Sequence, residues 1–182
     1  MIILFGAIGS GKTEQGERLA RRLNCPRLSS SQLLRQHSDP AHIKQIAEGT
    51  LVSDQDVIKL LEPEFKRIGA DRNEFILDGS PRSIGQAKWL VDKIVAGEVK
   101  FTVIIYLKVP ENAVVERLKK RGRVDDKEEI IRHRLDEYAK ITTPVLDYLR
   151  GQGYQVDEVD GSPPPDEVEN SIQQVLENKN AG

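Results

Sequence analysis

The sequence is poor in cysteine and in aromatic residues. Among 182 residues there is one cysteine, Cys25, one tryptophan and only 5% aromatic residues in all. A lone cysteine excludes a disulfide within the chain and a zinc site built from several cysteines. We expect Cys25 to be a small buried residue, and the scattered aromatic residues to pack in the core.

Long apolar runs and an excess of one charge are also missing. No segment approaches the roughly 20 apolar residues needed to cross a membrane, and the first apolar run, MIILF, is too short for the core of a signal peptide. Lys and Arg number 27 against 29 Asp and Glu, a net charge of −2. This balance argues against nucleic acid or an anionic membrane as a partner. We expect a soluble, cytoplasmic protein without either partner.

Short apolar runs alternate with helical patterns along the chain. The strand candidates are residues 2–5, 27–29, 75–77, 101–107 and 154–159. Strands that alternate with helices are typical of a parallel α/β sheet. A length of 182 residues suits one domain with a good core. We therefore expect a single α/β domain over residues 1–182.

Two helical stretches have a clear apolar face, and a third region is more polar. The stretch WLVDKIVAG carries its apolar residues on one side, at Leu90, Val91, Ile94 and Val95. Residues 128–149 form a longer amphipathic run, whose apolar face includes Ile141. Pro144 should kink or restart this run because proline lacks an N–H group. Residues 30–59 contain short helical pieces and polar loops, and we expect a small insert at the edge of the sheet.

A glycine-rich segment follows the first strand. Residues 6–13 read GAIGSGKT, which has the spacing G-x-x-x-x-G-K-[ST] of a phosphate-binding loop between a strand and a helix. Glycine lets backbone N–H groups turn toward an anion, and the helix N-terminus attracts negative charge. Lys12 would reach the terminal phosphates of a nucleotide, and the Thr13 hydroxyl would bind Mg²⁺.

An acid and several arginines supply a second signal. Asp78 ends the apolar run FILDG, and an Asp there is a usual partner of Mg²⁺ or its waters, although the pattern also marks an ordinary strand exit. Guanidinium groups suit a kinase whose acceptor is itself a phosphate, because they clamp two polyphosphates that repel each other. The candidates for such a cleft are Arg35, Arg82, Arg117, Arg121, Arg123, Arg132 and Arg134.

In this order, the residues resemble the adenylate kinase family of nucleoside monophosphate kinases over nearly the whole chain. The matching segments are GAIGSGKTEQ at 6–15, LSSSQLLR at 28–35, GTLVSDQDV at 49–57, FILDGSPRSIGQA at 75–87, ERLKKRGRVDDKEEIIRHRLDEY at 116–138 and VDGS at 159–162. The resemblance implies transfer of the γ-phosphoryl group of ATP to AMP with Mg²⁺, by a monomer. It also implies a three-layer P-loop kinase fold with a five-stranded parallel sheet, a monophosphate-binding insert at 30–59 and a very short lid at 117–134.

The resemblance further implies roles for residues at matching positions. The residues expected to act in phosphoryl transfer are Lys12, Arg82, Arg123 and Arg134. Those expected to contact ATP are Gly9, Ser10, Gly11, Lys12, Thr13, Glu14, Arg117, Arg121 and Pro163. Those expected to contact the monophosphate are Ser30, Arg35, Thr50, Leu51, Val52, Gly79, Ser80, Pro81, Arg82, Gln86, Arg123 and Arg134. The residues expected to contact the metal are Thr13 and Asp78. In this family the residue equivalent to Gln86 hydrogen-bonds adenine, which favours AMP over UMP or CMP.

Two features depart from the family pattern. The loop reads GKTEQ where family members usually have GKGTQ. The extra carboxylate, Glu14, either repels the ATP phosphates or simply lies in the first turn of the helix, where the dipole favours it. The lid segment KRGRVDD lacks several residues usually found between its two arginines, here Arg121 and Arg123.

Two other interpretations stay open. One is a UMP/CMP kinase or a broad-specificity monophosphate kinase, although Gln86 argues against this interpretation. The other is a P-loop protein that binds nucleotide with weak or no turnover, which Glu14 and the short lid would favour. A shikimate- or gluconate-type kinase shares the loop, but the stretch DGSPRSIGQ and the arginines fit it poorly.

Overall fold

The computed structural model describes residues 1–37, 40–48, 50–122 and 127–180. Arg123, for which the family resemblance implies a role in phosphoryl transfer, lies outside these ranges. No helix within them has the length and apolar character needed to span a lipid bilayer.

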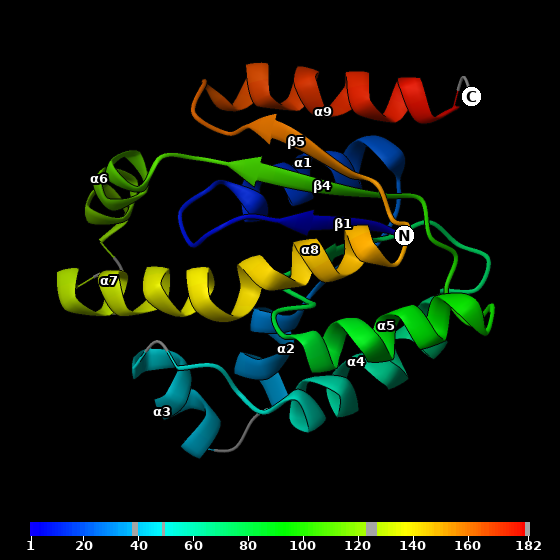
Figure 1. Cartoon of the computed structure of the whole chain (residues 1–182), viewed down its shortest axis with the longest axis horizontal. Helices are drawn as coiled ribbons and strands as arrows, with labels where there is room; N and C mark the ends of the chain where they lie inside the picture. Colours follow the sequence, from blue (N-terminus) through cyan, green and yellow to red (C-terminus); the bar gives the residue numbers. More distant parts are fainter. Residues whose placement is uncertain (38–39, 49, 123–126, 181–182) are drawn as a thin grey trace.

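A five-stranded parallel sheet forms the centre of the molecule (Figure 1). Its strands are β1 (Ile2–Phe5), β2 (Arg27–Ser29), β3 (Ile76–Asp78), β4 (Val103–Lys108) and β5 (Val156–Asp160), in the order β2-β3-β1-β4-β5. β1 lies in the middle, where Ile3 pairs with Leu77 on one side and Ile104 on the other. The predicted α/β fold is confirmed, although β3, β4 and β5 begin one or two residues later than predicted.

One face of the sheet is covered by α1 (Lys12–Leu23) and α9 (Pro165–Asn180). Leu19 of α1 and Ile172 of α9 pack with Ile2 and Leu4 of β1 in one apolar cluster. Figure 1 shows α9 running along β5 at the upper edge of the molecule. This layer brings the N-terminus of α1 to the end of the central strand.

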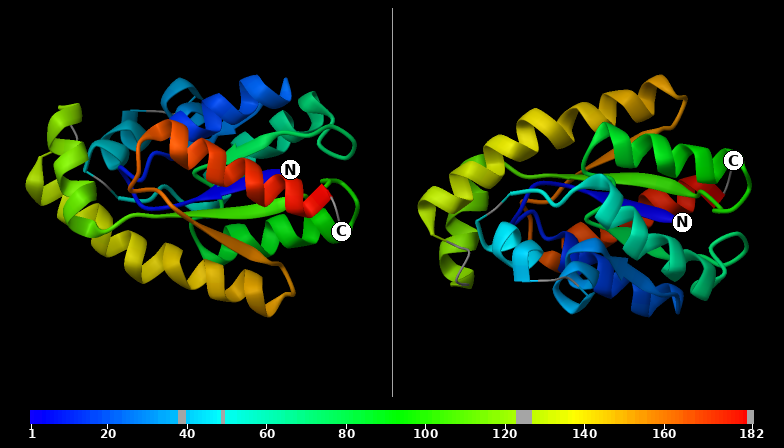
Figure 2. Two further views of the ribbon diagram at one scale, coloured as in Figure 1. Left: turned by 90° about the horizontal axis from the view of Figure 1, so that it is seen from above. Right: turned by 90° about the horizontal axis from the view of Figure 1, so that it is seen from below.

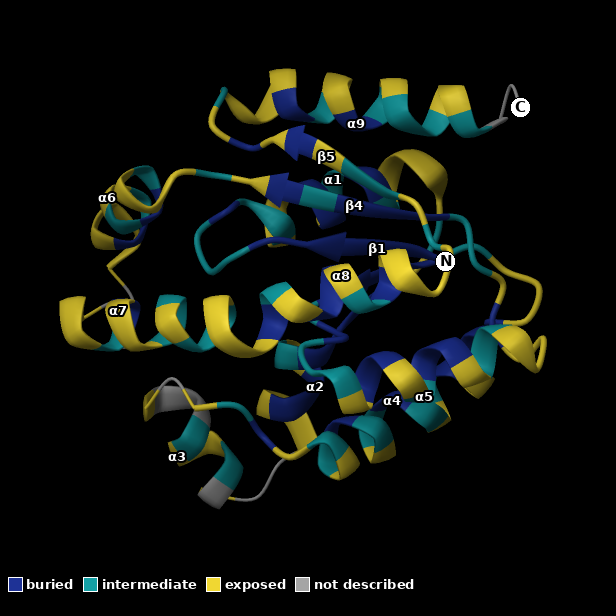
Figure 3. Cartoon of the chain, viewed as in Figure 1, coloured by how far each residue is buried: buried dark blue, intermediate teal, exposed yellow. Residues whose placement is uncertain are grey.

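The opposite face is covered by α2 (Ser30–His37), α4 (Asp54–Ile68), α5 (Ile84–Val95) and α8 (Thr143–Gly151). Ile3 and Phe5 of β1 join the larger apolar cluster on this side, because successive side chains of a strand point to opposite faces. The turned views in Figure 2 show helices on both sides of the strands, and Figure 3 shows β1 and most of β4 buried between helices that are exposed on their outer sides. The molecule therefore has three layers.

The remaining helices lie near the carboxyl ends of the central strands. They are α3 (Pro40–Glu48), α6 (Glu111–Arg121) and α7 (Glu128–Glu137). In Figure 1, β1 and β4 point toward the side of the molecule that carries α6. Val114 and Leu118 of α6 pack with Ile131 of α7 in a small separate cluster.

The amphipathic run predicted over residues 128–149 is interrupted before Pro144. A π-helical segment, Tyr138–Thr142, separates α7 from α8. Pro144 lies in the first turn of α8, where the missing N–H group is tolerated. The predicted restart of the helix at this proline is therefore confirmed.

Two apolar residues assigned to buried helix faces are exposed instead. Val95 is 79% exposed and Ile141 is 37% exposed. Both lie where the regular α-helix stops. Val95 is the last residue of α5, and Ile141 belongs to the π segment, whose wider turn shifts the phase of the apolar face.

Candidate functional site

A cavity of about 1260 Å³ opens at the carboxyl ends of β1 and β3. Ligands of open α/β sheets bind at this end of the strands. A smaller cavity of about 50 Å³ adjoins it. The wall that both cavities share is formed by Ser31, Arg35, Leu51, Gly79, Arg82 and Arg134.

The predicted site residues that the structure describes lie around these two cavities. The large cavity is lined by Gly9, Ser10, Gly11, Lys12, Thr13, Glu14, Arg35, Leu51, Asp78, Gly79, Ser80, Pro81, Arg82, Arg117, Arg121, Arg134 and Pro163. The small cavity adds Ser30, Thr50, Val52 and Gln86. The structure thus brings these residues together, while the ligand that each of them binds stays a prediction.

The glycine loop connects β1 to α1 at the floor of the large cavity. Gly9 and Gly11 have φ angles of 74° and 93°, in the left-handed region that glycine adopts without strain. A Cβ at Gly9 would lie 3.0 Å from Cγ of Leu118, so α6 packs closely against the loop. The N-terminus of α1 opens at the cavity, where its unpaired N–H groups favour an anion.

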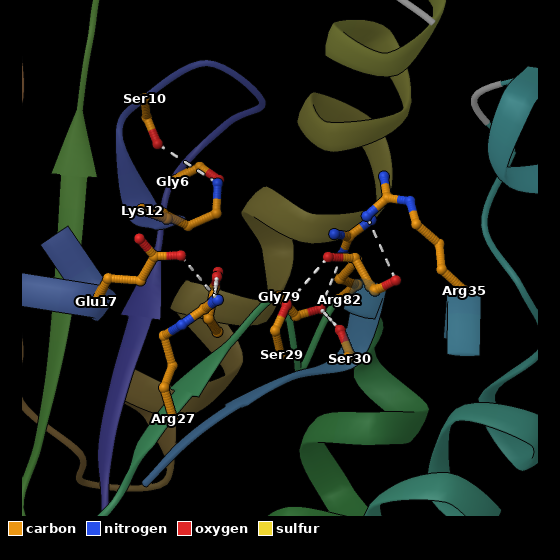
Figure 4. A network of polar contacts seen from close by, with 12 residues as sticks. Gly6, Ser10, Lys12, Glu17, Arg27, Ser29, Ser30, Arg35, Gly79 and Arg82 are labelled. Atoms are coloured by element: carbon orange, nitrogen blue, oxygen red, sulfur yellow. Dashed lines mark hydrogen bonds and ion pairs between the residues drawn. The ribbon is translucent and has the colours of Figure 1, made fainter. Parts of the chain in front are cut away.

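Lys12, the first residue of α1, bends back over this loop (Figure 4). Its Nζ donates hydrogen bonds to the carbonyl oxygens of Gly6 and Ala7, at 2.5 and 2.7 Å. Burial lowers the pKa of Lys12 to about 8; the charge of Asp78 opposes this shift, and that of Arg82 adds to it. A bound phosphate would favour the charged form of Lys12. The site therefore holds a partly buried cation that a bound anion would stabilise.

Arg82 lies on the wall that the two cavities share. Its Nε donates a hydrogen bond to the carbonyl oxygen of Gly79 at 2.8 Å, and its own carbonyl oxygen accepts one from the Thr142 hydroxyl at 2.9 Å. Burial lowers the pKa of Arg82, and the charge of Asp78 opposes this shift. A guanidinium held in this way can recognise a phosphate through its terminal N–H groups.

Asp78 and Thr13 supply the oxygen atoms expected to meet Mg²⁺. Asp78 ends β3 with its side chain 5% exposed, and it lines the large cavity together with Thr13. Mg²⁺ prefers oxygen ligands and takes only one or two from the protein when waters and phosphates supply the rest. Across the described part of the chain, no three His, Cys, Asp or Glu residues gather to hold a metal. The two residues fit a metal that is shared with a nucleotide.

The sequence patterns do not single out Arg27, which also lines the large cavity. Arg27 is the first residue of β2, and its Nη1 lies 2.8 Å from Oδ2 of Asp78. Its Nη2 lies 3.3 Å from Oε1 of Glu17, as Figure 4 shows. A charged residue at the start of a short strand that is otherwise buried is the signal that could have identified it.

Glu14 is engaged by a residue one turn further along α1. Its Oε1 lies 3.1 Å from Nη2 of Arg18, and its side chain is 52% exposed. Arg18 also pairs with Asp166 and Glu169 of α9, at 2.6 and 2.9 Å. This geometry favours the interpretation that Glu14 belongs to the first turn of the helix, with a cation that reduces its repulsion of phosphates.

Arg117 fixes the segment that follows β5. Its Nη1 and Nη2 donate hydrogen bonds to the carbonyl oxygens of Gly161 and Ser162, each at 2.8 Å. Pro163, the next residue, lines the large cavity together with Arg117. The predicted contact of both residues with ATP requires such proximity.

Gln86 is held at both ends of its amide beside the small cavity. Its Oε1 accepts hydrogen bonds from the Ser80 hydroxyl at 3.0 Å and from the backbone N–H of Arg82 at 2.9 Å. Its Nε2 donates to Oδ1 of Asp54 at 3.0 Å. A backbone N–H can only donate and an ionised carboxylate can only accept, so these partners fix the orientation of the amide. Both lone pairs of Oε1 are used, and the second N–H of Nε2 is the group suited to a ligand.

Comparisons with known proteins agree with one another. A family model described as adenylate kinase matches residues 4–154. Adenylate kinase 1 of Synechocystis sp. is 35% identical over 181 residues, which cover 96% of each chain. The adenylate kinase of Methylobacterium radiotolerans is 34% identical over 192 residues, covering 97% of this chain and 95% of that protein. The adenylate kinase of Mycolicibacterium smegmatis is 35% identical over 155 residues, covering 82% of this chain and 85% of that protein.

Proposed function

Since this chain belongs to the adenylate kinase family, we propose that it transfers the γ-phosphoryl group of MgATP to AMP and forms two molecules of ADP. Family membership makes it a phosphotransferase of the nucleoside monophosphate kinase type. The observation that carries the proposal is the wall shared by the two cavities, where Arg35, Arg82 and Arg134 line both. Cations at this junction suit two phosphate groups that meet there.

In the proposed reaction the protein forms no covalent bond to either substrate. An oxygen of the acceptor phosphate is already a nucleophile, so no general base is required. The ATP phosphates would lie at the glycine loop, with AMP on the side of the small cavity. Lys12, Arg82 and Arg134 would hold the two phosphates in line and stabilise the charge on the group in transfer. Mg²⁺ held through Thr13 and Asp78 would supply further neutralisation of the ATP phosphates.

The amide of Gln86 supports AMP as the acceptor. Its hydrogen bonds to Ser80, Arg82 and Asp54 leave an N–H group, and no lone pair of Oε1, for a base. N1 of adenine accepts a hydrogen bond, whereas N1 of guanine and N3 of uracil carry a hydrogen. N3 of cytosine is also an acceptor, so CMP is the second candidate that this geometry favours.

Further assignments from the family belong to the same proposal. Residues 30–59 would hold the monophosphate, and residues 117–134 would close over the site and exclude water from the transfer. The protein would act as a monomer in the cytoplasm.

The test is Mg²⁺-dependent formation of ADP from ATP, with AMP, CMP, UMP and GMP in parallel and a sample without acceptor. We expect AMP to be preferred, with UMP and GMP at least about tenfold poorer in kcat/KM. Lys12→Met should abolish the activity, and Arg22→Gln, a change at an exposed position on the same helix, should not.

Each other outcome has a definite meaning. Preference for UMP or GMP would overturn the interpretation of Gln86. Turnover without acceptor would indicate an ATPase. ATP binding without transfer to any of the four acceptors would overturn the enzymatic proposal and leave a nucleotide-binding protein.

A further inference from the structure

Arg27 joins two carboxylates of very different exposure on the wall of the large cavity. Its guanidinium lies 2.8 Å from Asp78, whose side chain is 5% exposed, and 3.3 Å from Glu17, whose side chain is 51% exposed. Arg27 itself is 13% exposed. The pair with Asp78 is therefore the buried and well-shielded one, while the pair with Glu17 is screened by solvent.

Gly16 of α1 makes room for Arg27. A Cβ at Gly16 would lie 3.0 Å from Cδ of Arg27 and 3.2 Å from Cδ1 of Leu4. The aliphatic stem of Arg27 thus packs closely against the backbone of α1 at Gly16, next to the side chain of Leu4 in β1. This packing, together with the start of β2, directs the guanidinium to Asp78.

The same carboxylate is the one expected to face Mg²⁺. Lys12 and Arg82 also feel the charge of Asp78, but Arg27 is the residue that forms an ion pair with it. Breaking a buried ion pair by removing one partner is destabilising, so Arg27 stabilises Asp78 in the metal-free protein. A divalent cation at Asp78 would repel the guanidinium that already contacts it, because the two positive charges would share one carboxylate. Glu17 offers Arg27 a second acceptor on the solvent side.

We propose that Arg27 competes with Mg²⁺ for Asp78, and that transfer of Arg27 toward Glu17 accompanies metal entry. Arg27 is then a positioning residue that sets the free Mg²⁺ concentration at which the metal–nucleotide complex forms. This inference rests on the proposed use of MgATP and is independent of which monophosphate accepts the phosphoryl group.

The test measures metal dependence without turnover. The protein is mixed with AMPPNP, an ATP analogue that is not hydrolysed, and its thermal stabilisation is followed against free Mg²⁺. The measured quantity is the half-saturating Mg²⁺ concentration, so a change in the starting stability of a variant does not affect the comparison. We expect Arg27→Gln to lower this concentration about tenfold, because the competing charge is removed from a buried pair.

Glu17→Gln changes the other side of the competition. It removes the acceptor that would receive Arg27, so the half-saturating Mg²⁺ concentration should rise, about two- to threefold for an exposed pair. Because Glu17 is half-exposed, this variant keeps the test available even where Arg27→Gln is poorly folded. Arg22→Gln, which removes an exposed charge from the same helix, is the matched control and should leave the value unchanged.

A second measurement separates competition from phosphate binding. With Mg²⁺ removed by a chelator, AMPPNP should bind wild type and Arg27→Gln with affinities within about twofold of each other. Opposite shifts for Arg27→Gln and Glu17→Gln, with this affinity unchanged, would support the inference. Unchanged half-saturation in both variants, or a tenfold loss of metal-free affinity in Arg27→Gln, would overturn it.

The outcome does not depend on the proposed acceptor. If both shifts are observed but no ADP is formed, the competition at Asp78 is supported and the kinase proposal is overturned. If AMP is phosphorylated but neither shift is observed, the kinase proposal is supported and the competition at Asp78 is overturned.

Discussion

The large cavity contains the glycine loop and Lys12, whereas the small cavity contains Gln86, whose amide is held at both ends by hydrogen bonds to the protein. In the large cavity, burial lowers the pKa of Lys12 to about 8 and also lowers that of Arg82. In the small cavity, Gln86 has protein partners at both ends of its amide. One region holds charge that an anion would stabilise, and the other holds a donor in a fixed orientation.

This difference separates two tasks of a site for two nucleotides. A phosphate is recognised by charge and by backbone N–H groups, which any nucleotide satisfies. A base is recognised by the placement of one donor, which only some bases satisfy. Changes in the large cavity should therefore alter rate and stability for all acceptors, and changes in the small cavity should alter the choice among them.

The largest effect is expected for Lys12→Met. The loss of this cation should reduce kcat by at least about 10³-fold, as for other cations that stabilise phosphoryl transfer. The ligand-free variant should nevertheless be more stable at pH 7, by about 1–3 kcal/mol, because a partly buried ammonium with a lowered pKa is removed. Steady-state kinetics and urea unfolding measure the two quantities. A variant that is both inactive and less stable would contradict this picture of the large cavity.

The pH dependence of stability tests whether the pKa of Lys12 is lowered in the folded protein. Below a pH of about 8, Lys12 is protonated in the folded and the unfolded chain, and the cost of burying its charge is fully present. Between pH 8 and 10.5 the folded protein loses this proton before the unfolded chain does, so stability rises with pH. The stability advantage of Lys12→Met should therefore shrink from pH 7 to pH 10. A difference that stays constant over this range would show that the pKa of Lys12 is not lowered.

The small cavity is tested by Asp54→Asn. Asparagine is uncharged and can donate as well as accept, so it would hold Nε2 of Gln86 less firmly, and the amide orientation would depend mainly on the bonds of Oε1 to Ser80 and to the backbone N–H of Arg82. We expect the preference in kcat/KM for AMP over GMP to fall about tenfold, while the KM for ATP changes less than about twofold. Asp92→Asn, at an exposed position of α5, is the matched control. An unchanged preference would show that Asp54 acts on stability alone.

The smallest effect concerns Glu14. Because Glu14 pairs with Arg18, Glu14→Gln should change the KM for ATP less than about twofold. Arg18→Ala should raise this KM about two- to fourfold, and the double variant should restore it, since the uncompensated carboxylate is then absent. A large fall in KM for Glu14→Gln alone would mean that the carboxylate faces the phosphates.

The sheet and the glycine loop could be predicted because their signals are local. A run such as MIILF and the spacing of GAIGSGKT are complete within a few residues, and strand burial follows from the apolar pattern. The exposure of Val95 and Ile141 was missed because it depends on where each regular helix stops.

The connections around the site depend on distant segments. Arg27 meets a carboxylate 51 positions away, and Gln86 meets one 32 positions away. No pattern within one segment specifies such a pairing, so neither Arg27 nor Asp54 was identified from the sequence. The space beside Gly16 is likewise defined only by the side chains of Arg27 and Leu4, which pack against it in the folded protein. The roles of the residues carried over from the family remain predictions.

The measurement that tests the account most directly is calorimetric titration of AMP into protein already saturated with Mg²⁺ and AMPPNP. If the two cavities hold two nucleotides whose phosphates meet at Arg82, one AMP should bind per chain without displacing the analogue. Competition between AMP and AMPPNP for a single site, or no binding of AMP to the saturated protein, would contradict it.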